Sequence, residues 1–217
     1  MSLNSVLKQL KQYRVISVVR TSTPKLAATA IEWLSEASLR TFEITMTIPG
    51  VVHLMTQYAS REDILIGAGT VTSEDQAKRC LDAGAKYLVS PCVVPELPEI
   101  SHQHGMPCFL GALTPTELHS AVRAGADAVK IFPIKRMGGV PYFKALESVF
   151  LGVPLVPTGG VIPDEIAIYL KSGATCVGIG SELVNEAMIR EGQREKIIHL
   201  GKQIQQQATT FSFTESV

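Results

Sequence analysis

Short apolar segments of strand length recur along the chain, and their alternation with helical segments constrains the fold more than any other feature. Between them, apolar residues fall at helical spacing, as in residues 25–35, 73–83, 116–124 and 163–171. Strands that are apolar at almost every position are buried on both faces, as in parallel sheets, and parallel neighbours need crossover helices. Eight such units predict an α/β fold, a (β/α)8 barrel, with an open doubly wound sheet as the alternative. The eight segments are residues 15–19, 41–45, 64–66, 87–89, 107–110, 128–132, 154–157 and 176–179.

The chain length fits one barrel. Because this fold typically takes ~250 residues, a chain of 217 residues leaves room for short loops and no second domain, so we expect residues 1–217 to form a single barrel domain. Apolar residues in residues 1–13 predict an N-terminal amphipathic helix, which we expect to cover the closed end of the barrel. From Gln205 to Val217 the apolar period is lost, which predicts a frayed C-terminal tail.

A weak internal repeat indicates which side chains face one another inside the barrel. Each copy closes a predicted helix with a glycine, or with Ser38 in a degenerate copy, and the copies precede the second, fourth, sixth and eighth strands. Alternate strands of an eight-stranded barrel contribute to the same interior layer. Residues at equal offsets from the copies should therefore share a layer, with a lysine facing a carboxylate. These residues are Glu43, Val89, Lys130 and Gly178.

Lys130 and Glu43 are the candidate catalytic residues. Lys130 lies in the apolar segment Ala-Val-Lys-Ile-Phe-Pro, and burial favours the neutral amine that attacks a ketone to form a Schiff base. Glu43 would then shuttle protons as the carbinolamine forms and breaks. The alternative is a structural ion pair between the two side chains.

Two glycine-containing turns predict a phosphate site. Thr158-Gly159-Gly160 follows the seventh strand and Gly180-Ser181 follows the eighth, each before a helix. Glycine lets backbone N–H groups approach a phosphate, and barrels often bind phosphate after these two strands. The alternative is that both are simply tight turns. The Gly-x-Gly at the eighth strand lacks the acidic partner of a dinucleotide fingerprint, so no NAD is expected.

Other polar residues follow the first, third and fourth strands. Arg20 would lie at the catalytic mouth, where its guanidinium suits a carboxylate, although an exposed solubilising arginine fits as well. Thr70 and Pro91 end the third and fourth strands and could line the site or only form turns. His102-x-His104 is the only metal-like spacing, and no carboxylate constellation accompanies it, so no metal site is expected.

Charge and cysteine usage exclude several functional classes. Lys and Arg together number 20, as do Asp and Glu, so no net charge favours nucleic acid or an anionic membrane. No apolar run is long enough to span a membrane, and the first residues do not resemble a secretory signal. The four cysteines never form Cys-x-x-Cys, and two of them lie in apolar strand-like segments, which favours reduced, buried thiols over a disulfide framework or a zinc site. We therefore expect a cytoplasmic protein.

In order and spacing, six motifs resemble those of the 2-keto-3-deoxy-6-phosphogluconate and 4-hydroxy-2-oxoglutarate aldolases, from about residue 15 to about residue 184. The motifs are residues 42–45, 66–71, 89–91, 129–133, 157–161 and 178–181. The resemblance implies a class I aldolase without metal or other cofactor, a (β/α)8 fold and a homotrimer. It implies a phosphorylated keto acid as substrate, cleaved to pyruvate and glyceraldehyde 3-phosphate. It makes Lys130 the Schiff-base lysine and Glu43 the general acid and base. It places Thr70, Pro91 and Thr158 at the pyruvate end and Gly159, Gly160, Gly180 and Ser181 at the phosphate.

The sequence departs from that family at two positions. Thr47 stands where many gluconate-type members have an arginine, so we expect Arg20, which other branches share, to bind the substrate carboxylate. Lys135 reverses the charge of a common glutamate near the mouth. The galactonate epimer of the substrate therefore remains an alternative, and so do a phosphosugar epimerase or isomerase and a non-catalytic barrel that binds a phosphorylated metabolite.

Overall fold

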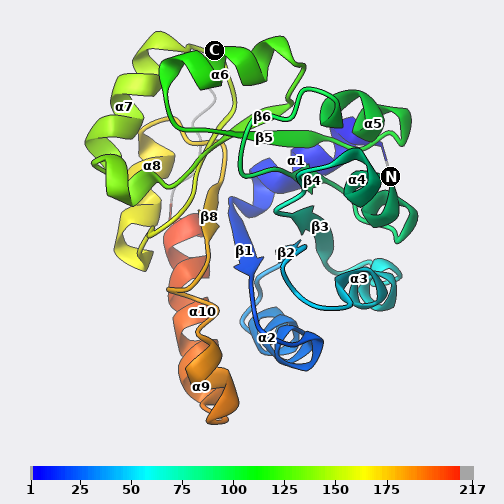
Figure 1. Cartoon of the computed structure of the whole chain (residues 1–217). Helices are drawn as coiled ribbons and strands as arrows, with labels where there is room; N and C mark the ends of the chain where they lie inside the picture. Colours follow the sequence, from blue (N-terminus) through cyan, green and yellow to red (C-terminus); the bar gives the residue numbers. More distant parts are fainter. Residues whose placement is uncertain (1, 211–217) are drawn as a thin grey trace.

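The computed structural model describes residues 2–210, and within that range eight parallel strands form the predicted barrel (Figure 1). The hydrogen-bonded order is β7-β6-β5-β4-β3-β2-β1-β8, and a parallel bridge between Thr158 and Gly178 joins the two outer strands. The single (β/α)8 architecture is therefore confirmed, and the doubly wound alternative is wrong. The strands are β1 (Val15–Val19), β2 (Thr41–Thr45), β3 (Leu65–Gly69), β4 (Leu88–Val89), β5 (Cys108–Ala112), β6 (Ala128–Ile131), β7 (Leu155–Pro157) and β8 (Val177–Ile179).

Helices surround the strands, and their starts follow local sequence signals. The side chains of Thr23, Ser73 and Thr114 accept a hydrogen bond from the first turn of α2, α4 and α6, which satisfies a backbone N–H that would otherwise lack a partner. The helices are α1 (Leu3–Tyr13), α2 (Pro24–Glu36), α3 (Val51–Ala59), α4 (Glu74–Asp82), α5 (Leu97–Gln103), α6 (Pro115–Arg123), α7 (Val140–Val149), α8 (Ile166–Lys171), α9 (Glu186–Arg190) and α10 (Arg194–Thr209). Two 3-10 turns, η1 (Ile134–Met137) and η2 (Pro163–Glu165), follow β6 and β7.

The repeat has the backbone conformation that its glycines predict. Gly84, Gly125 and Gly173 have φ values of 94°, 90° and 98°. Ser38, the degenerate copy, also adopts a positive φ of 68°. Each copy therefore ends its helix in the same left-handed turn and enters the next even-numbered strand in the same way.

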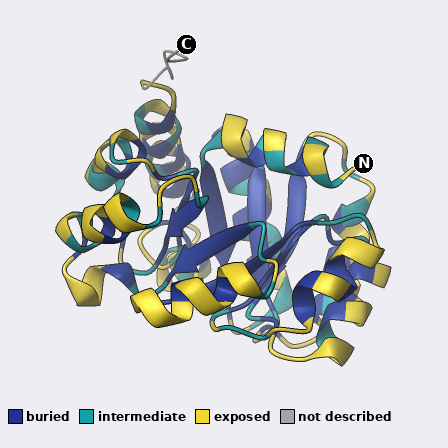
Figure 2. Cartoon of the chain, turned by 90° about the horizontal axis from the view of Figure 1, so that it is seen from above, coloured by how far each residue is buried: buried dark blue, intermediate teal, exposed yellow. Residues whose placement is uncertain are grey.

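The inside of the barrel is closed at one end by α1. Val6 and Leu10 of this helix are buried in a cluster with residues that face the inside of the barrel, among them Ile16 of β1, Phe109 of β5 and Tyr87, which precedes β4. The expected N-terminal lid is confirmed. A second, larger core lies between the strands and the outer helices, so the strands are buried on both faces (Figure 2). The open end is therefore the one at which the strands finish.

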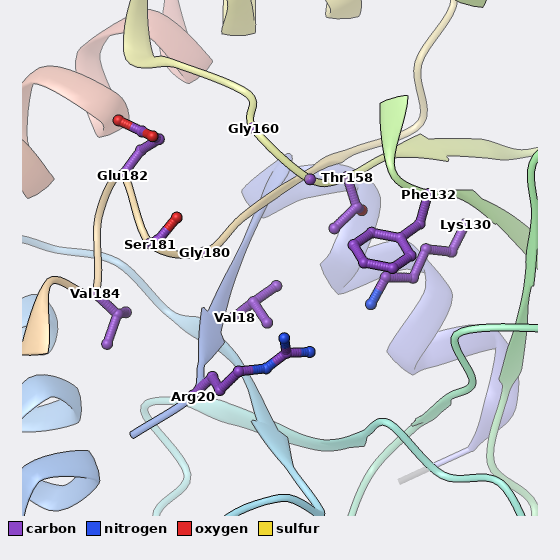
Figure 3. A pocket seen from close by; sticks show the side chains of 11 residues that line it. Val18, Arg20, Lys130, Phe132, Thr158, Gly160, Gly180, Ser181, Glu182 and Val184 are labelled. Carbon is purple, nitrogen blue, oxygen red and sulfur yellow. The ribbon is translucent and has the colours of Figure 1, made fainter. Parts of the chain in front are cut away.

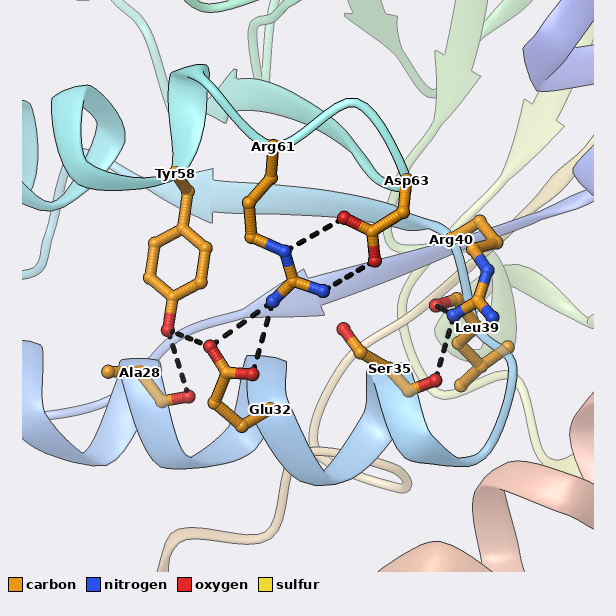
Figure 4. A network of polar contacts seen from close by, with 8 residues as sticks. All are labelled: Ala28, Glu32, Ser35, Leu39, Arg40, Tyr58, Arg61 and Asp63. Carbon is orange, nitrogen blue, oxygen red and sulfur yellow. Dashed lines mark hydrogen bonds and ion pairs between the residues drawn. The ribbon is translucent and has the colours of Figure 1, made fainter.

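Polar contacts join neighbouring outer helices (Figure 4). The Tyr58 hydroxyl of α3 donates to Glu32 of α2 at 2.8 Å, and Arg61 donates to Glu32 and to Asp63. The hydrogen bond from Arg61 lowers the pKa of the Asp63 carboxyl. These contacts lie outside the barrel and hold α2 against α3.

The C-terminal helix extends beyond its predicted end. We expected a frayed tail from Gln205, but α10 continues to Thr209. Ala208 is buried and its carbonyl accepts a hydrogen bond of 3.0 Å from the Arg14 side chain, which compensates for the polar sequence. The prediction for residues 211–217 falls outside the described residues. No helix within residues 2–210 has the length and apolar character needed to span a membrane.

Candidate functional site

Lys130 and Glu43 meet inside the barrel, as the repeat predicted. Lys130 projects from β6 and Glu43 from β2, and the lysine Nζ lies 2.9 Å from Oε1 and 3.3 Å from Oε2 of the carboxylate. Lys130 is 6% exposed and Glu43 is 2% exposed. A paired ammonium and carboxylate are therefore held together where almost no water reaches them.

Glycines on β3 provide the space that these large side chains need. A Cβ atom at Gly69 would lie 2.3 Å from Glu43 Oε1, and one at Gly67 would lie 2.3 Å from the Tyr87 ring. Any larger residue would displace the carboxylate or the ring. Sequence reasoning assigned no role to these glycines in the site, although two glycines within one strand are a signal of close approach.

A pocket of about 180 Å³ opens beside Lys130 at the carboxyl ends of the strands (Figure 3). Lys130 lies at its inner side, and Arg20 extends into it from the end of β1 (Figure 3). The Phe132 ring also lines it, with its centroid 5.5 Å from Lys130 Nζ. The pocket is lined by Val18, Arg20, Lys130, Phe132, Thr158, Gly159, Gly160, Gly180, Ser181, Glu182 and Val184.

The two predicted phosphate turns form one wall of this pocket. Gly159 and Gly160 have φ values of 93° and 79°, which favour glycine. After β8, the Gly180 carbonyl accepts hydrogen bonds from the N–H groups of Leu183 and Val184. The helical segments that follow, η2 and α9, are short, so the glycine-containing turns themselves would have to supply the donors.

Two predicted site residues lie away from this pocket. Thr70, which ends β3 with a φ of 58°, is not among the lining residues. Pro91 lines a separate hollow with Cys92, and Phe132 lines both this hollow and the pocket. The structure thus brings eight of the ten predicted residues together, counting Glu43 through its contact with Lys130, and leaves these two at the mouth.

Arg20 is held at the mouth by contacts of its own loop. Ser22, two residues further on, donates hydrogen bonds of 2.7 Å from both its N–H and its hydroxyl to Glu186 of α9. Arg20 itself forms no ion pair within the described residues. Thr47 bonds instead to the Thr45 hydroxyl at 2.8 Å. Arg20 is thus a cation in the pocket that can receive an anionic group.

The sequence did not predict the positions of two charged residues near the mouth, Lys135 and Glu182. Lys135 forms an ion pair with Glu165 of η2, and its backbone N–H donates to the Gly159 carbonyl at 3.1 Å. Lys135 therefore braces the turn after β7 from outside the pocket. Glu182 lines the pocket beside Ser181, and no sequence signal distinguished it from other surface glutamates.

The described residues contain no group of three or more His, Cys, Asp or Glu side chains placed to hold a metal ion. His102, part of the one metal-like spacing, lies 2.8 Å from Asp127, whose carboxylate also accepts the Cys108 N–H. This histidine has a packing and pairing role at the surface.

Comparisons with known proteins agree on one family. Residues 6–200 match the family model described as "Aldolase: KDPG and KHG aldolase". The chain is similar to a 2-dehydro-3-deoxy-phosphogluconate aldolase of Treponema pallidum (strain Nichols), with 30% identity over 200 residues, 92% of this chain and 95% of the relative. A 2-dehydro-3-deoxy-6-phosphogalactonate aldolase of Escherichia coli (strain K12) is 30% identical over 174 residues, 78% of this chain and 83% of the relative. A crystal structure of KDPG aldolase from Legionella pneumophila holds pyruvate captured at low pH as a covalent carbinolamine intermediate. It superimposes with a TM-score of 0.80 at 30% identity, over 88% of this chain and 93% of that one.

Proposed function

The chain belongs to the KDPG and KHG aldolase family, and on this basis we propose that it cleaves 2-keto-3-deoxy-6-phosphogluconate to pyruvate and glyceraldehyde 3-phosphate. The observation that carries the proposal is the buried contact of 2.9 Å between Lys130 Nζ and Glu43 at the inner side of the pocket. A Schiff-base lysine needs a neighbouring acid and base, and this pair supplies both.

The proposed reaction begins when Lys130 transfers a proton to Glu43 and attacks the C2 ketone as a neutral amine. The carbinolamine loses water, with Glu43 returning the proton to the departing hydroxyl, and leaves a protonated imine. Glu43 then removes the proton of the C4 hydroxyl, the C3–C4 bond breaks, and its electron pair moves toward the iminium nitrogen to give an enamine and the free aldehyde. Protonation of C3 and addition of water release pyruvate and the lysine.

The remaining predicted residues would bind the two ends of the substrate. We assign the carboxylate to Arg20, whose guanidinium lies in the pocket (Figure 3). Thr158 would contact the pyruvate portion, while Thr70 and Pro91 would close the barrel mouth beside it. The phosphate would accept hydrogen bonds from the turns that contain Gly159, Gly160, Gly180 and Ser181. A five-carbon substrate such as 4-hydroxy-2-oxoglutarate would place its distal carboxylate at the same turns.

Borohydride reduction in the presence of pyruvate tests the proposed chemistry. Mass spectrometry should find the three-carbon unit on Lys130 and not on the lysines at positions 135 and 144. Labelling elsewhere refutes the assignment, and the absence of labelling would favour an epimerase or a binding protein. Cleavage should also survive exhaustive EDTA treatment, because the proposed mechanism uses no metal.

A substrate panel separates the closest alternatives. Pyruvate release should be fastest from the gluconate epimer and slower from the galactonate epimer and from 4-hydroxy-2-oxoglutarate. The galactonate epimer is the second candidate substrate, because one relative is a 2-dehydro-3-deoxy-6-phosphogalactonate aldolase. We further propose a homotrimer in the cytoplasm, as the resemblance implies, and light scattering on the purified protein would measure the number of subunits.

A further inference from the structure

A tyrosine that the reaction above does not use lies inside the barrel. Tyr87 immediately precedes β4 and is 0% exposed, and its hydroxyl has no hydrogen-bond partner among the described residues. Leaving a buried hydroxyl unpaired is unfavourable, and most buried polar groups in proteins are paired. A phenylalanine would fill the same space without this cost. Packing alone therefore does not explain why this residue carries a hydroxyl.

The Tyr87 ring lies over the strand position that is paired with Glu43. A Cβ atom at Gly67 would lie 2.3 Å from both Cε2 and Cζ of Tyr87, so the end of the ring that carries the hydroxyl covers Gly67. Gly67 is the residue paired with Glu43 in the register between β2 and β3. Burial, followed by the charge of Glu43, raises the pKa of Tyr87 well above its ordinary value. The phenol therefore keeps its proton and can only act as a donor toward a carboxylate.

Lys130 is the side chain that donates to Glu43 in the structure, and it loses N–H groups when it becomes an imine. Lys130 Nζ contacts both carboxylate oxygens, at 2.9 and 3.3 Å. Once the nitrogen is bound to the substrate carbon, these two contacts cannot both persist. Cys176, beside β8, is a further titratable side chain near Glu43, and burial raises the pKa of this thiol to about 12, so it carries no charge.

We propose that Tyr87 is a positioning residue for Glu43: its hydroxyl donates a hydrogen bond to the carboxylate after Lys130 has become an imine. One carboxylate oxygen is then held by Tyr87, and the other faces the proton of the substrate hydroxyl. This inference rests on the proposed function, because it assigns Tyr87 a role only in a Schiff-base reaction.

Tyr87→Phe tests the role, because it removes only the hydroxyl. We expect kcat for cleavage of the phosphorylated keto acid to fall about tenfold, while the amount of pyruvate trapped on Lys130 at equilibrium is unchanged. A hydrogen bond donated to a carboxylate favours its charged form. The acidic limb of the kcat–pH profile should therefore move to higher pH in the variant, by up to about one unit for a tenfold effect.

Tyr169→Phe is the matched control. The Tyr169 hydroxyl is also buried and without a partner, but it belongs to α8, where the ring packs against Phe143 outside the barrel. This variant should keep the wild-type kcat and pH profile. Neither variant should lose thermal stability, because each removes an unpaired polar atom.

Three results would overturn the role of Tyr87. A wild-type kcat and pH profile in Tyr87→Phe would show that the hydroxyl does not act on Glu43. A lower melting temperature with equal losses in cleavage and imine trapping would show that Tyr87 serves packing, and so would failure of the variant to fold. The proposed function is judged separately, by imine trapping and cleavage in the wild-type enzyme.

Discussion

Removing the two buried charges of the site one at a time should destabilise the protein more than removing them together. Lys130→Met leaves the Glu43 carboxylate, 2% exposed, without its counter-charge, and Glu43→Gln does the same to the lysine, 6% exposed. Removing one partner of a buried ion pair typically costs about 3–5 kcal/mol. For a chain of this size, about 2–4 °C of melting temperature is lost per kcal/mol, so each single variant should melt roughly 6–20 °C below the wild type. The double variant leaves no unpaired charge and should melt above both.

Thermal unfolding followed by circular dichroism at pH 7 gives the melting temperatures of the wild type and the three variants. Pyruvate release should show that all three variants have lost most of their cleavage activity. Additive losses, with the double variant melting below both single variants, would refute the reasoning and show that the two charges are stabilised independently of each other.

Three further predictions concern the mouth, the turn after β7 and the cysteines. Arg20→Ala should weaken pyruvate binding by about 1.5–3 kcal/mol, the usual contribution of a hydrogen bond to a charged group. The pyruvate concentration needed for half-maximal borohydride trapping measures this affinity. An unchanged affinity would contradict the proposed role of Arg20. Gly160→Val forces a φ of 79° on a branched residue and directs its Cβ to 2.6 Å from the Lys135 Cβ. The value of kcat/KM for the phosphorylated substrate should therefore fall far more than imine formation with pyruvate. Equal losses in both assays would show that this turn does not bind the phosphate. Cys92, the exposed thiol, should be alkylated in the folded protein at pH 8, whereas the buried thiols should react only after unfolding, and labelling of a buried thiol in the native state would count against the predicted burial. Burial raises the pKa to about 11 for Cys80 and to about 12 for Cys108 and Cys176. These values exceed the pKa of about 8.5 that a cysteine has in the unfolded chain. The buried thiols should therefore contribute fully to stability below about pH 8.5, and this contribution should be lost as the pH rises above that value.

The features that the sequence predicted are those that follow from periodicity along the chain. The eight strands and the contact between Lys130 and Glu43 both follow from regular spacing, because equal offsets from a repeated turn lead to equivalent positions in a symmetric barrel. Strand ends were less accurate. β3 was expected to end at Ile66 but continues to Gly69, because backbone pairing with β2 persists where glycines interrupt the apolar run.

Side-chain contacts between distant elements could not be predicted in this way. Lys135 appeared to add a positive charge to the mouth, yet its charge is paired with Glu165, 30 positions later in the chain. Tyr87 begins a predicted strand, and nothing near it in the sequence indicates that its ring lies over Gly67. Neither contact has a period or a local motif. Each depends on how two loops or two strands come together in the folded barrel. The glycines of β3 indicate a close approach, but they do not indicate that the partner is Tyr87.

The pocket lies to one side of the barrel axis, and the interior packing explains why. Its lining comes from β1, β6, β7 and β8 and the loops that follow them. On the opposite side, the Tyr87 ring covers Gly67, and the backbone of Pro91 lies so close to Gly111 that a Cβ there would be 2.2 Å from its carbonyl carbon. These close contacts narrow the interior on that side, and the hollow beside Pro91 and Gly111 is separate from the pocket that contains Lys130, which lies on the side of Arg20 and the glycine-containing turns. Glu43 projects from β2, which does not line the pocket, and lies beside it through its contact of 2.9 Å with Lys130. In the proposed reaction, the proton transfers would take place at the inner end of the pocket and the aldehyde end of the substrate would bind at the turns. We therefore expect changes in the turns to alter which aldehyde is accepted more than they alter the proton transfers.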